Sequence, residues 1–270
     1  MKKPFRVVTW NLHHGKVSSL AWDYLLELNP DIALLQEVGI LPEKISSRFS
    51  KYASIAIKKD GMPQRFNTAI LVKGRVGEPI LLSAPIQWMA KELKRFDGNL
   101  VTGQVVLDNG PIVKAVSVYS PAWAIERTRV SIYDLSEITL PTANGIWLAD
   151  ILWASLKHMK LNANEPWIIA GDFNLSETFD TWNVGKQSNR AYLQRMRELG
   201  LTECLRESQG QLTPTFRNPT RGNPVMHQMD HLFVTNVLAD NLVTCSTGDK
   251  DIVFGERLSD HLPIIADFAI

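Results

Sequence analysis

Short apolar runs alternate along the chain with segments of helical periodicity. The apolar runs are rich in Val, Ile and Leu and are bounded by Gly, Pro, Asn or Asp, a pattern that predicts β-strands. We expect strands over residues 5–10, 31–36, 52–57, 67–73, 101–107, 111–119, 166–171, 230–235 and 263–269. The helical pattern predicts helices over residues 18–28, 42–50, 145–160 and 189–199. The sequence shows no convincing repeat, low-complexity tract or linker between these segments.

Single residues indicate where the helices begin and end. Ser18 is suited to cap the first helix, and Pro30 closes it. Gly200 is suited to end the last helix, because glycine readily adopts the left-handed conformation that follows a helix C-terminus. In the helix expected over residues 145–160, one face is formed by Ile151, Leu152, Ser155, Leu156 and Met159.

Composition and charge narrow the class of protein. The 270 residues are 45% hydrophobic and 21% charged, as in a globular protein with a sizeable core. The net charge of +1 argues neither for nor against a polyanionic partner. Cys204 and Cys245 form no Cys-x-x-Cys pair or disulfide framework, which indicates reduced thiols in a cytoplasmic protein. No apolar run approaches the length of a membrane helix, and the basic N-terminus lacks a signal-peptide core.

Candidate chemistry gathers at the ends of the expected strands. Acidic, amide and imidazole side chains stand there, namely Asn11, Glu37, Asp172, Asn174, Asp230, Asp260 and His261. Carboxylate oxygens suit hard cations such as Mg²⁺ or Mn²⁺, whereas a zinc site would favour His and Cys ligands. The sequence therefore predicts one oxygen-rich metal site with a histidine beside it. If Asn11 and His261 share this site, the two chain ends meet, which favours a single domain over residues 1–270.

Each of these motifs also has a purely structural interpretation. In that interpretation Glu37 ends a strand in solvent, and Asp172 and Asn174 belong to an Asx-type turn. In the functional interpretation Gly171 allows a sharp turn or a close backbone approach. The Asp172 and Asn174 side chains then project to the same side of an extended segment.

Short motifs follow one another along the chain as Thr9-Trp10-Asn11, Leu35-Gln36-Glu37-Val38, Val118-Tyr119-Ser120-Pro121, Gly171-Asp172-Phe173-Asn174, Met229-Asp230-His231 and Ser259-Asp260-His261. This ordered set resembles the endonuclease/exonuclease/phosphatase superfamily, which includes the AP endonucleases and pancreatic deoxyribonuclease. The resemblance implies an α/β fold of four layers, with two mixed β-sheets packed face to face and helices on both outer sides. It also implies hydrolysis of a phosphate ester that depends on Mg²⁺ or Mn²⁺.

The resemblance assigns metal-binding roles. Glu37 resembles the principal metal ligand, and Asp260 resembles a second carboxylate near the metal. Asn11 resembles the amide that supports this metal or the phosphate. These assignments are consistent with phosphoryl transfer, which needs charge neutralisation on the equatorial oxygens and an in-line water.

The resemblance also assigns catalytic roles. Asp172 resembles the residue that orients or deprotonates the attacking water, and Asn174 resembles a donor to the phosphoryl oxygens. His261, held by Asp230, resembles the residue that contacts the scissile phosphate. Such a carboxylate fixes the imidazole tautomer and stabilises the protonated ring. The structural alternative is that Asp230 lies on the surface and His261 in the core, unrelated to each other.

Two positions bear on the branch of the family. Tyr119 stands where many phosphatase and sphingomyelinase branches carry a histidine, and it resembles the AP endonuclease and exonuclease branch. A phenol can hydrogen-bond a phosphoryl oxygen or support the leaving group, if its pKa is lowered near the metal; the alternative is a tyrosine that closes a strand. AP enzymes usually have Asp where His13 stands. The string Asn11-Leu12-His13-His14-Gly15 instead resembles a broad bacterial group of undetermined specificity. One interpretation is that His13 helps to bind a second metal or a substrate phosphate. The alternative is that the pair His13 and His14 only shapes the loop.

Substrate contacts would require basic and aromatic side chains on loops above the site. The candidates are His13, Trp123, Phe216, Arg217 and Arg221, and residues 213–229 have the turn-rich composition of a substrate loop. The alternative is that these residues are solvated charges and core aromatics. A nuclease acting on DNA or RNA therefore competes with a phosphatase or phosphodiesterase for a small molecule or lipid, such as a sphingomyelin- or inositol-phosphate-like ester. A non-catalytic scaffold would have lost a site residue, and the sequence retains them all.

Overall fold

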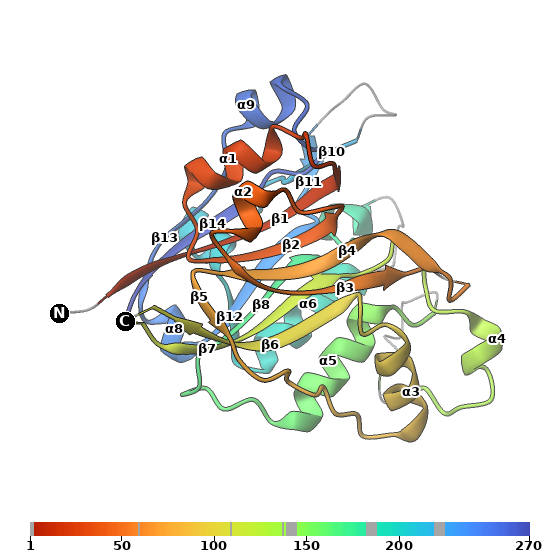
Figure 1. Cartoon of the computed structure of the whole chain (residues 1–270). Coiled ribbons are helices and arrows are strands. Elements are labelled where there is room, and N and C mark those ends of the chain that lie inside the picture. Colours follow the sequence, from red (N-terminus) through yellow and green to blue (C-terminus); the bar gives the residue numbers. More distant parts are fainter. Residues whose placement is uncertain are drawn as a thin grey trace.

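The computed structural model describes residues 3–58, 60–108, 110–136, 138, 145–181, 188–218 and 225–270. Within these ranges two six-stranded β-sheets pack face to face (Figure 1). Across the first sheet the strands are β13 (Leu242–Thr247), β14 (Ile264–Ala269), β1 (Pro4–Gly15), β2 (Ile32–Val38), β4 (Pro63–Val72) and β3 (Ser50–Ile57). Across the second they are β5 (Gly74–Val76), β6 (Leu100–Leu107), β7 (Ile112–Tyr119), β8 (Trp167–Asp172), β12 (Asp230–Thr235) and β9 (Leu201–Glu203).

Both sheets are mixed. In the first sheet β1 runs parallel to β2 and antiparallel to β14. In the second sheet β8 runs parallel to β7 and antiparallel to β12. A short two-stranded ribbon is formed by β10 (Phe216–Arg217) and β11 (Val225–His227). Because β1 and β14 are neighbours, the first and last strands of the chain lie side by side (Figure 1).

Helices cover the outer faces of both sheets (Figure 1). The first sheet packs against α1 (Ala21–Leu28), α2 (Glu43–Ser46) and α9 (Lys250–Gly255). The second sheet packs against α3 (Gln87–Arg95), α5 (Leu148–Met159) and α6 (Ser188–Glu198). Shorter helical segments are α4 (Arg127–Val130), the 3-10 turn η1 (Glu177–Thr181), α7 (Cys204–Gln209) and α8 (Asn236–Ala239). The arrangement confirms the expected α/β sandwich of four layers.

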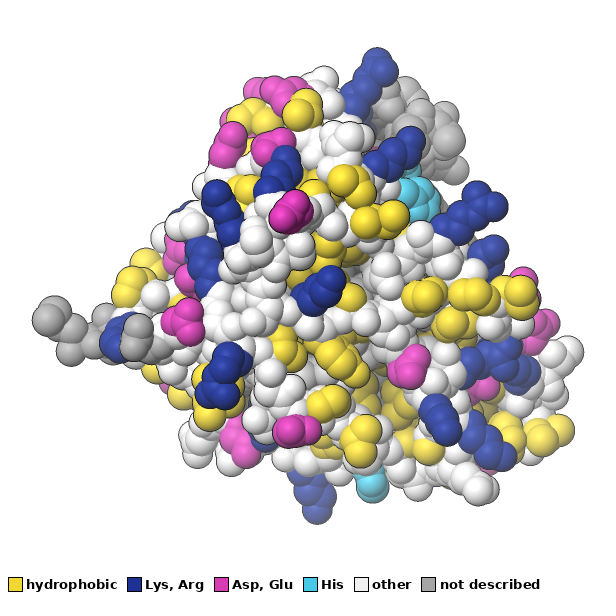
Figure 2. All heavy atoms as spheres, in the orientation of Figure 1, with side chains coloured by type: hydrophobic (Ala, Val, Ile, Leu, Met, Phe, Trp, Pro, Cys, Tyr) yellow, Lys and Arg dark blue, Asp and Glu magenta, His cyan; other side chains and the backbone are white. Residues whose placement is uncertain are grey.

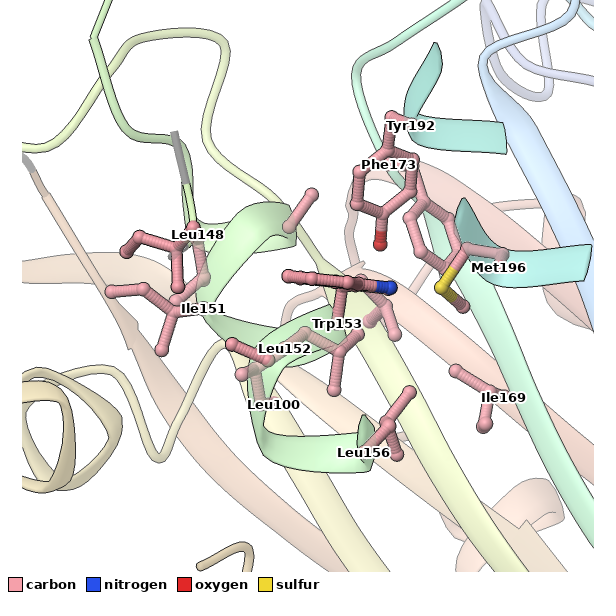
Figure 3. Close-up of a cluster of buried hydrophobic side chains, with 14 of the residues drawn as sticks. Leu100, Leu148, Ile151, Leu152, Trp153, Leu156, Ile169, Phe173, Tyr192 and Met196 are labelled. Carbon is pink, nitrogen blue, oxygen red and sulfur yellow. The ribbon is translucent and has the colours of Figure 1, made fainter. Parts of the chain in front are cut away.

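Buried apolar side chains fill the spaces between the layers. One cluster of apolar side chains lies between the two sheets and includes Leu34, Ile70, Ile168 and Leu232, all fully buried. An outer layer lies beneath α5, where Figure 3 shows Leu152 and Trp153 close to the sheet strands. The predicted face is buried at Ile151, Leu152, Ser155 and Leu156, but Trp153 and Ala154 between them are buried as well, so α5 is covered on more than the one face that its spacing predicted. No helix in the described ranges is long and apolar enough to cross a membrane.

The structure corrects the beginning of the first helix and the length of the second. The Ser19 amide donates to the Lys16 carbonyl at 2.9 Å, and this turn delays α1 until Ala21. Ser18 is therefore not its cap; the hydroxyl of Ser19 accepts a hydrogen bond from the Ala21 amide. The helix expected over residues 42–50 is a single turn, Glu43–Ser46, because β3 already begins at Ser50. Gly200 has φ 79 and follows α6, as expected.

Candidate active site

The candidate residues meet where strands of the two sheets end. In the second sheet, Tyr119 of β7 and Asp230 of β12 are the register partners of Asp172 on β8. In the first sheet, Asn11 of β1 is the register partner of the residue before Glu37. The Asn11 amide nitrogen lies 3.0 Å from Asp172 Oδ2 and 3.5 Å from Glu37 Oε1. Residues from both sheets therefore form one polar cluster.

The Gly-Asp-x-Asn segment needs its glycine. Gly171 has φ +148, and a Cβ atom built there would lie 2.0 Å from the carbonyl oxygen of Val118. Any side chain would collide with the neighbouring strand. The Asn174 amide N–H then donates to Asp172 Oδ1 at 2.8 Å, which is the Asx-type contact expected of this sequence. The Asx-type turn and the polar cluster therefore do not exclude each other, because the contact that forms the turn also fixes the Asp172 carboxylate within the cluster.

Asp230 holds His261 through a short hydrogen bond. Asp230 Oδ2 lies 2.8 Å from His261 Nδ1 and accepts a second hydrogen bond from the Thr215 hydroxyl at 2.6 Å. Burial alone would lower the pKa of His261, but the carboxylates of Asp230 and Asp172 outweigh it and raise that pKa to about 10. The ring is an imidazolium at neutral pH, with Nε2 as its remaining donor.

Asp172 has the properties of a base that works near neutral pH. Burial raises the pKa of its carboxyl group to about 7, and the positive charge of His261 opposes this rise. Its oxygens also receive hydrogen bonds from the side chains of Asn11 at 3.0 Å and Asn174 at 3.1 Å. The same Asn174 amide donates to the Ser120 carbonyl at 2.7 Å. In this geometry Asn174 chiefly positions Asp172.

Tyr119 closes the site from the second sheet. Its ring is packed edge-on against Phe66, with centroids 5.2 Å apart, and only 7% of the residue is exposed. Burial, followed by the charges of Glu37 and Asp172, raises the pKa of the phenol well above its ordinary value. Tyr119 is therefore a neutral hydrogen-bond donor and not a phenolate.

One group in the described part of the chain brings three potential metal ligands together. Oxygen and nitrogen atoms of Asp172, Asp230 and His261 all lie within 4.8 Å of one another. The hydrogen bond between Asp230 and His261 and the positive charge on His261 make this set a poor cation site. The Glu37 and Asp260 side chains are 14% and 21% exposed, against 1% for Asp230, and so admit a hydrated ion. Asp260 Oδ1 is a buried atom that lies 3.1 Å from His13 Nδ1.

The side-chain nitrogen of Asn11 points toward the carboxylates of Glu37 and Asp172. Its oxygen accepts the backbone N–H of His13 at 2.9 Å. Its backbone carbonyl accepts the Ser259 hydroxyl at 2.7 Å, and that hydroxyl also accepts the His261 amide. Asn11 therefore ties the two carboxylates and the Ser-Asp-His segment together, and it could offer its oxygen to a cation only by turning its amide over.

The candidate substrate residues are divided by the structure. The Phe216 ring lies 4.9 Å from the His261 ring, and the Arg217 amide donates to the Asp260 carbonyl at 2.9 Å. The Arg217 guanidinium packs over Phe254. Trp123 lines a separate surface hollow of about 480 Å³ with Lys58, Asp60, Gln64 and Glu126. Arg221 lies outside the described residues.

Sequence reasoning missed several residues that support the site. Thr215 holds Asp230, Ser259 links Asn11 to His261, and Phe66 packs between Tyr119 and His14. Ser259 belongs to the Ser-Asp-His motif, in which only Asp260 and His261 were given a role. Thr215 and Phe66 carry no local pattern that distinguishes them from other loop and strand residues.

The chain belongs to the endonuclease/exonuclease/phosphatase family, whose model matches residues 8–261. It is thus an enzyme of a phosphoesterase family. No curated protein matches the chain in sequence.

Solved structures share the fold over almost the whole chain. An AP endonuclease from Archaeoglobus fulgidus is 18% identical, with 98% of this chain and 100% of that chain covered and a TM-score of 0.70. A 3'-5' exonuclease from Neisseria meningitidis is 18% identical, with 97% and 99% covered and a TM-score of 0.66. A Neisseria 3' phosphatase bound to a product DNA hairpin is 17% identical, with 98% and 99% covered and a TM-score of 0.64. At these identities the likeness establishes the fold.

Proposed function

We propose that the protein is a Mg²⁺- or Mn²⁺-dependent phosphodiester hydrolase that acts as a nuclease on DNA or RNA. The observation that carries this proposal is the contact of Asn11 with both Glu37 and Asp172, which brings the strand ends of the two sheets into one site. Beside it lies the Asp230–His261 pair. Such a set can bind a cation, a water and a phosphate together.

The residues divide the work of hydrolysis. Glu37 and Asp260 would hold the cation, which when bound neutralises negative charge on the phosphate. Asp172 would orient the attacking water and accept its proton, because its pKa of about 7 suits a base at neutral pH. The His261 imidazolium would donate a hydrogen bond to a phosphoryl oxygen as negative charge develops there.

Tyr119 and Asn174 would supply further hydrogen bonds to the phosphate. The neutral phenol of Tyr119 can donate a hydrogen bond to the leaving oxygen or to a phosphoryl oxygen. Asn174 would donate to the phosphate by exchanging one of its present partners, Ser120 or Asp172, for a phosphoryl oxygen. Water attacks phosphorus in line with the departing oxygen, one P–O bond forms and the opposite P–O bond breaks.

Several observations favour a nucleic-acid substrate. The solved neighbours include an AP endonuclease, a 3'-5' exonuclease and a 3' phosphatase bound to DNA. Phe216 against His261 offers a ring for contact with a sugar or base next to the scissile phosphate. Arg217, His13 and Trp123, together with Arg221, are the proposed further contacts.

A phosphatase or phosphodiesterase for a small-molecule or lipid phosphate ester is the second candidate. On the face drawn in Figure 2, basic side chains are interspersed with acidic and apolar ones, and the net charge is only +1. A weakly charged surface gives a polyanion little long-range attraction.

Buried free thiols at Cys204 and Cys245 support the proposal of a cytoplasmic protein.

A substrate panel separates these candidates. Purified protein is incubated with Mg²⁺ or Mn²⁺ and with abasic-site duplex, single-stranded DNA, RNA and sphingomyelin. We expect cleavage of a nucleic acid that stops with EDTA. Activity confined to sphingomyelin or another small ester would support the second candidate function, a phosphatase or phosphodiesterase.

Metal activation is tested with Glu37→Gln. Removal of the charge on the principal ligand should raise the metal concentration needed for half-maximal activity by at least about tenfold. The exposed Asp97→Asn variant is the matched control. An unchanged metal requirement in Glu37→Gln would refute the assignment of Glu37.

A further inference from the structure

The proposed mechanism does not use a cationic hollow that lies between α6, α7 and η1. Its volume is about 450 Å³, and its lining residues are Glu177, Arg190, Ala191, Gln194, Arg197 and Arg206. Arg190, Gln194 and Arg197 follow the helical repeat, so that they share one face of α6. Because α7 adds Arg206, three guanidinium groups line the same hollow with a single carboxylate, that of Glu177.

The lining carries an excess of positive charge. Glu177 Oε1 lies 3.0 Å from Arg206 Nη1, and Glu177 Oε2 lies 3.8 Å from Arg190 Nε. One carboxylate facing three arginines leaves a formal local charge of +2, whereas the whole chain carries only +1. The Arg190 and Arg206 side chains are 64% and 27% exposed, so a ligand can reach them from solvent.

Hydrogen bonds to the backbone hold the walls of the hollow in place. The Asp180 carboxylate of η1 accepts the backbone N–H of Asn189 at 3.2 Å and that of Arg190 at 2.9 Å. These bonds join η1 to the first turn of α6. Glu203, which is buried, caps α7 by accepting the Arg206 backbone N–H at 3.1 Å. The helices that carry the arginines are therefore fixed before any ligand binds, which lowers the cost of binding.

The hollow lies close to the active site through η1. Thr178, the neighbour of Glu177, has its hydroxyl oxygen 2.7 Å from His227 Nδ1. His227 on β11 is the register partner of Phe216 on β10, and the Phe216 ring packs on His261. Only the β10–β11 ribbon and the η1 turn thus separate the hollow from His261. A strand of nucleic acid bound at the site would bring a phosphate beyond the scissile one to this hollow.

We propose that the hollow binds phosphate, supplied by the backbone of the nucleic-acid substrate outside the scissile position. Guanidinium groups bind phosphate oxygens through paired hydrogen bonds, and such contacts position a strand without reading its sequence. The hollow would give a polyanion the local attraction that the nearly neutral chain lacks as a whole. This inference rests on the proposed function, because it takes a nucleic acid as the substrate. Free phosphate is the other source of the same group.

Fluorescence anisotropy tests the proposal in the presence of EDTA, which prevents metal-dependent cleavage. The probes are a fluorescein-labelled abasic-site duplex and a labelled single-stranded DNA. We expect Arg190→Gln/Arg197→Gln to weaken binding at least about tenfold and to lower the slope of log K against log salt by about 1.4–1.8, because two phosphate contacts are lost. The matched control is Arg48→Gln/Arg75→Gln, which removes the same charge from exposed positions beside the starts of β3 and β5. The start of β3 pairs through β4 with the start of β2, away from Glu37, so the control should bind as the wild type does.

Hydrolysis of bis(p-nitrophenyl) phosphate, which is too small to span the site and the hollow, should be equal in the wild type and in Arg190→Gln/Arg197→Gln. Unchanged DNA affinity and salt slope in this variant, or an equal loss in the control variant, would overturn the inference and leave the proposed function intact. Inorganic phosphate that binds the wild type but not the variant in calorimetry, with DNA affinity unchanged, would overturn the backbone contact and assign the hollow to free phosphate. Failure of the wild type to cleave any nucleic acid in the substrate panel would instead refute the proposed function.

Discussion

At the scale of single residues, Asp172 is where the contacts of the two sheets converge. It receives the Asn11 amide at 3.0 Å from the first sheet and the Asn174 backbone amide at 2.8 Å from its own turn. Its pKa of about 7 reflects burial in a site that also holds a positive ring. A carboxyl group with this support can exchange a proton with water near neutral pH.

Asp172→Asn should therefore lower kcat by about 10²–10⁴-fold while KM changes little, because the amide keeps the shape and cannot accept the proton. Steady-state kinetics with circular dichroism as the check on folding measures this. Asp97→Asn, at an exposed position, should retain full activity. Equal turnover in Asp172→Asn and the wild type would remove Asp172 from the reaction.

Gly171 offers a stability test at the same scale. Gly171→Ala should lower the free energy of unfolding by more than about 3 kcal/mol, because the methyl group adds backbone strain to a collision with the Val118 carbonyl. Gly255→Ala is the control, since nothing lies within 4 Å of its Cβ position. Urea unfolding that showed equal losses in the two variants would contradict the close approach at Gly171.

At the scale of elements, α5 begins with a buried carboxylate. Asp150 Oδ2 accepts the Trp147 backbone N–H at 2.8 Å. Burial raises the pKa of Asp150 from 3.8 to about 6. The folded state therefore favours the protonated form, so the stabilising contribution is complete below the unfolded pKa and is lost as pH rises through about 6.

Asp150→Asn should remove this pH dependence while retaining an acceptor for Trp147. The shift from 3.8 to about 6 corresponds to about 3 kcal/mol. The variant should therefore gain up to that amount relative to the wild type between pH 4 and pH 8, as measured by urea unfolding at each pH. A stability difference that stays constant over this range would show that Asp150 does not titrate as stated.

The sequence predicted the central strands better than the edges. Strands β2 and β8 begin with continuous apolar runs, Ile32–Leu35 and Trp167–Ala170, because both of their faces are covered. At an edge of the first sheet, β13 was missed because it exposes Val243 and Thr244 and contains few large apolar residues. Helix α3 was also missed, although Met89 and Leu93 stand one turn apart and are both buried. That spacing was a usable signal.

The site was predictable wherever one residue type carries the chemistry. Glu37, Asp172 and His261 stood out together because acidic, amide and imidazole side chains recur at the ends of several expected strands, and their roles stay a prediction. Thr215 was not predictable, because its role comes from a hydrogen bond to Asp230 that only the folded loop creates. The opposed burial and charge effects on the pKa of His261 likewise require the three-dimensional arrangement.

At the scale of the whole molecule, the first and last strands close the first sheet. Arg6 on β1 forms two hydrogen bonds to its register partner Asp267 on β14, at 2.7 and 2.9 Å. These strands lead to Asn11 and away from His261, so closure of the sheet also assembles the site. We propose on this basis that residues 1–270 fold as one domain.

Leu34→Ala tests that proposal. Leu34 is fully buried between the sheets, and its truncation should lower the free energy of unfolding by about 3 kcal/mol in a single transition. Leu81, which is 85% exposed, is the matched control, and Leu81→Ala should change stability by less than about 0.5 kcal/mol. Two separate unfolding transitions for Leu34→Ala would contradict a single cooperative domain.

We propose that this cluster is a metal-dependent phosphodiester hydrolase site. The most direct measurement is hydrolysis of bis(p-nitrophenyl) phosphate by the wild-type protein and by His261→Ala, with Mn²⁺, with Mg²⁺ and with EDTA. We expect hydrolysis with a divalent cation that disappears with EDTA and falls at least about 100-fold in a folded His261→Ala variant. Hydrolysis that persists in EDTA, or that is unchanged by His261→Ala, would contradict it.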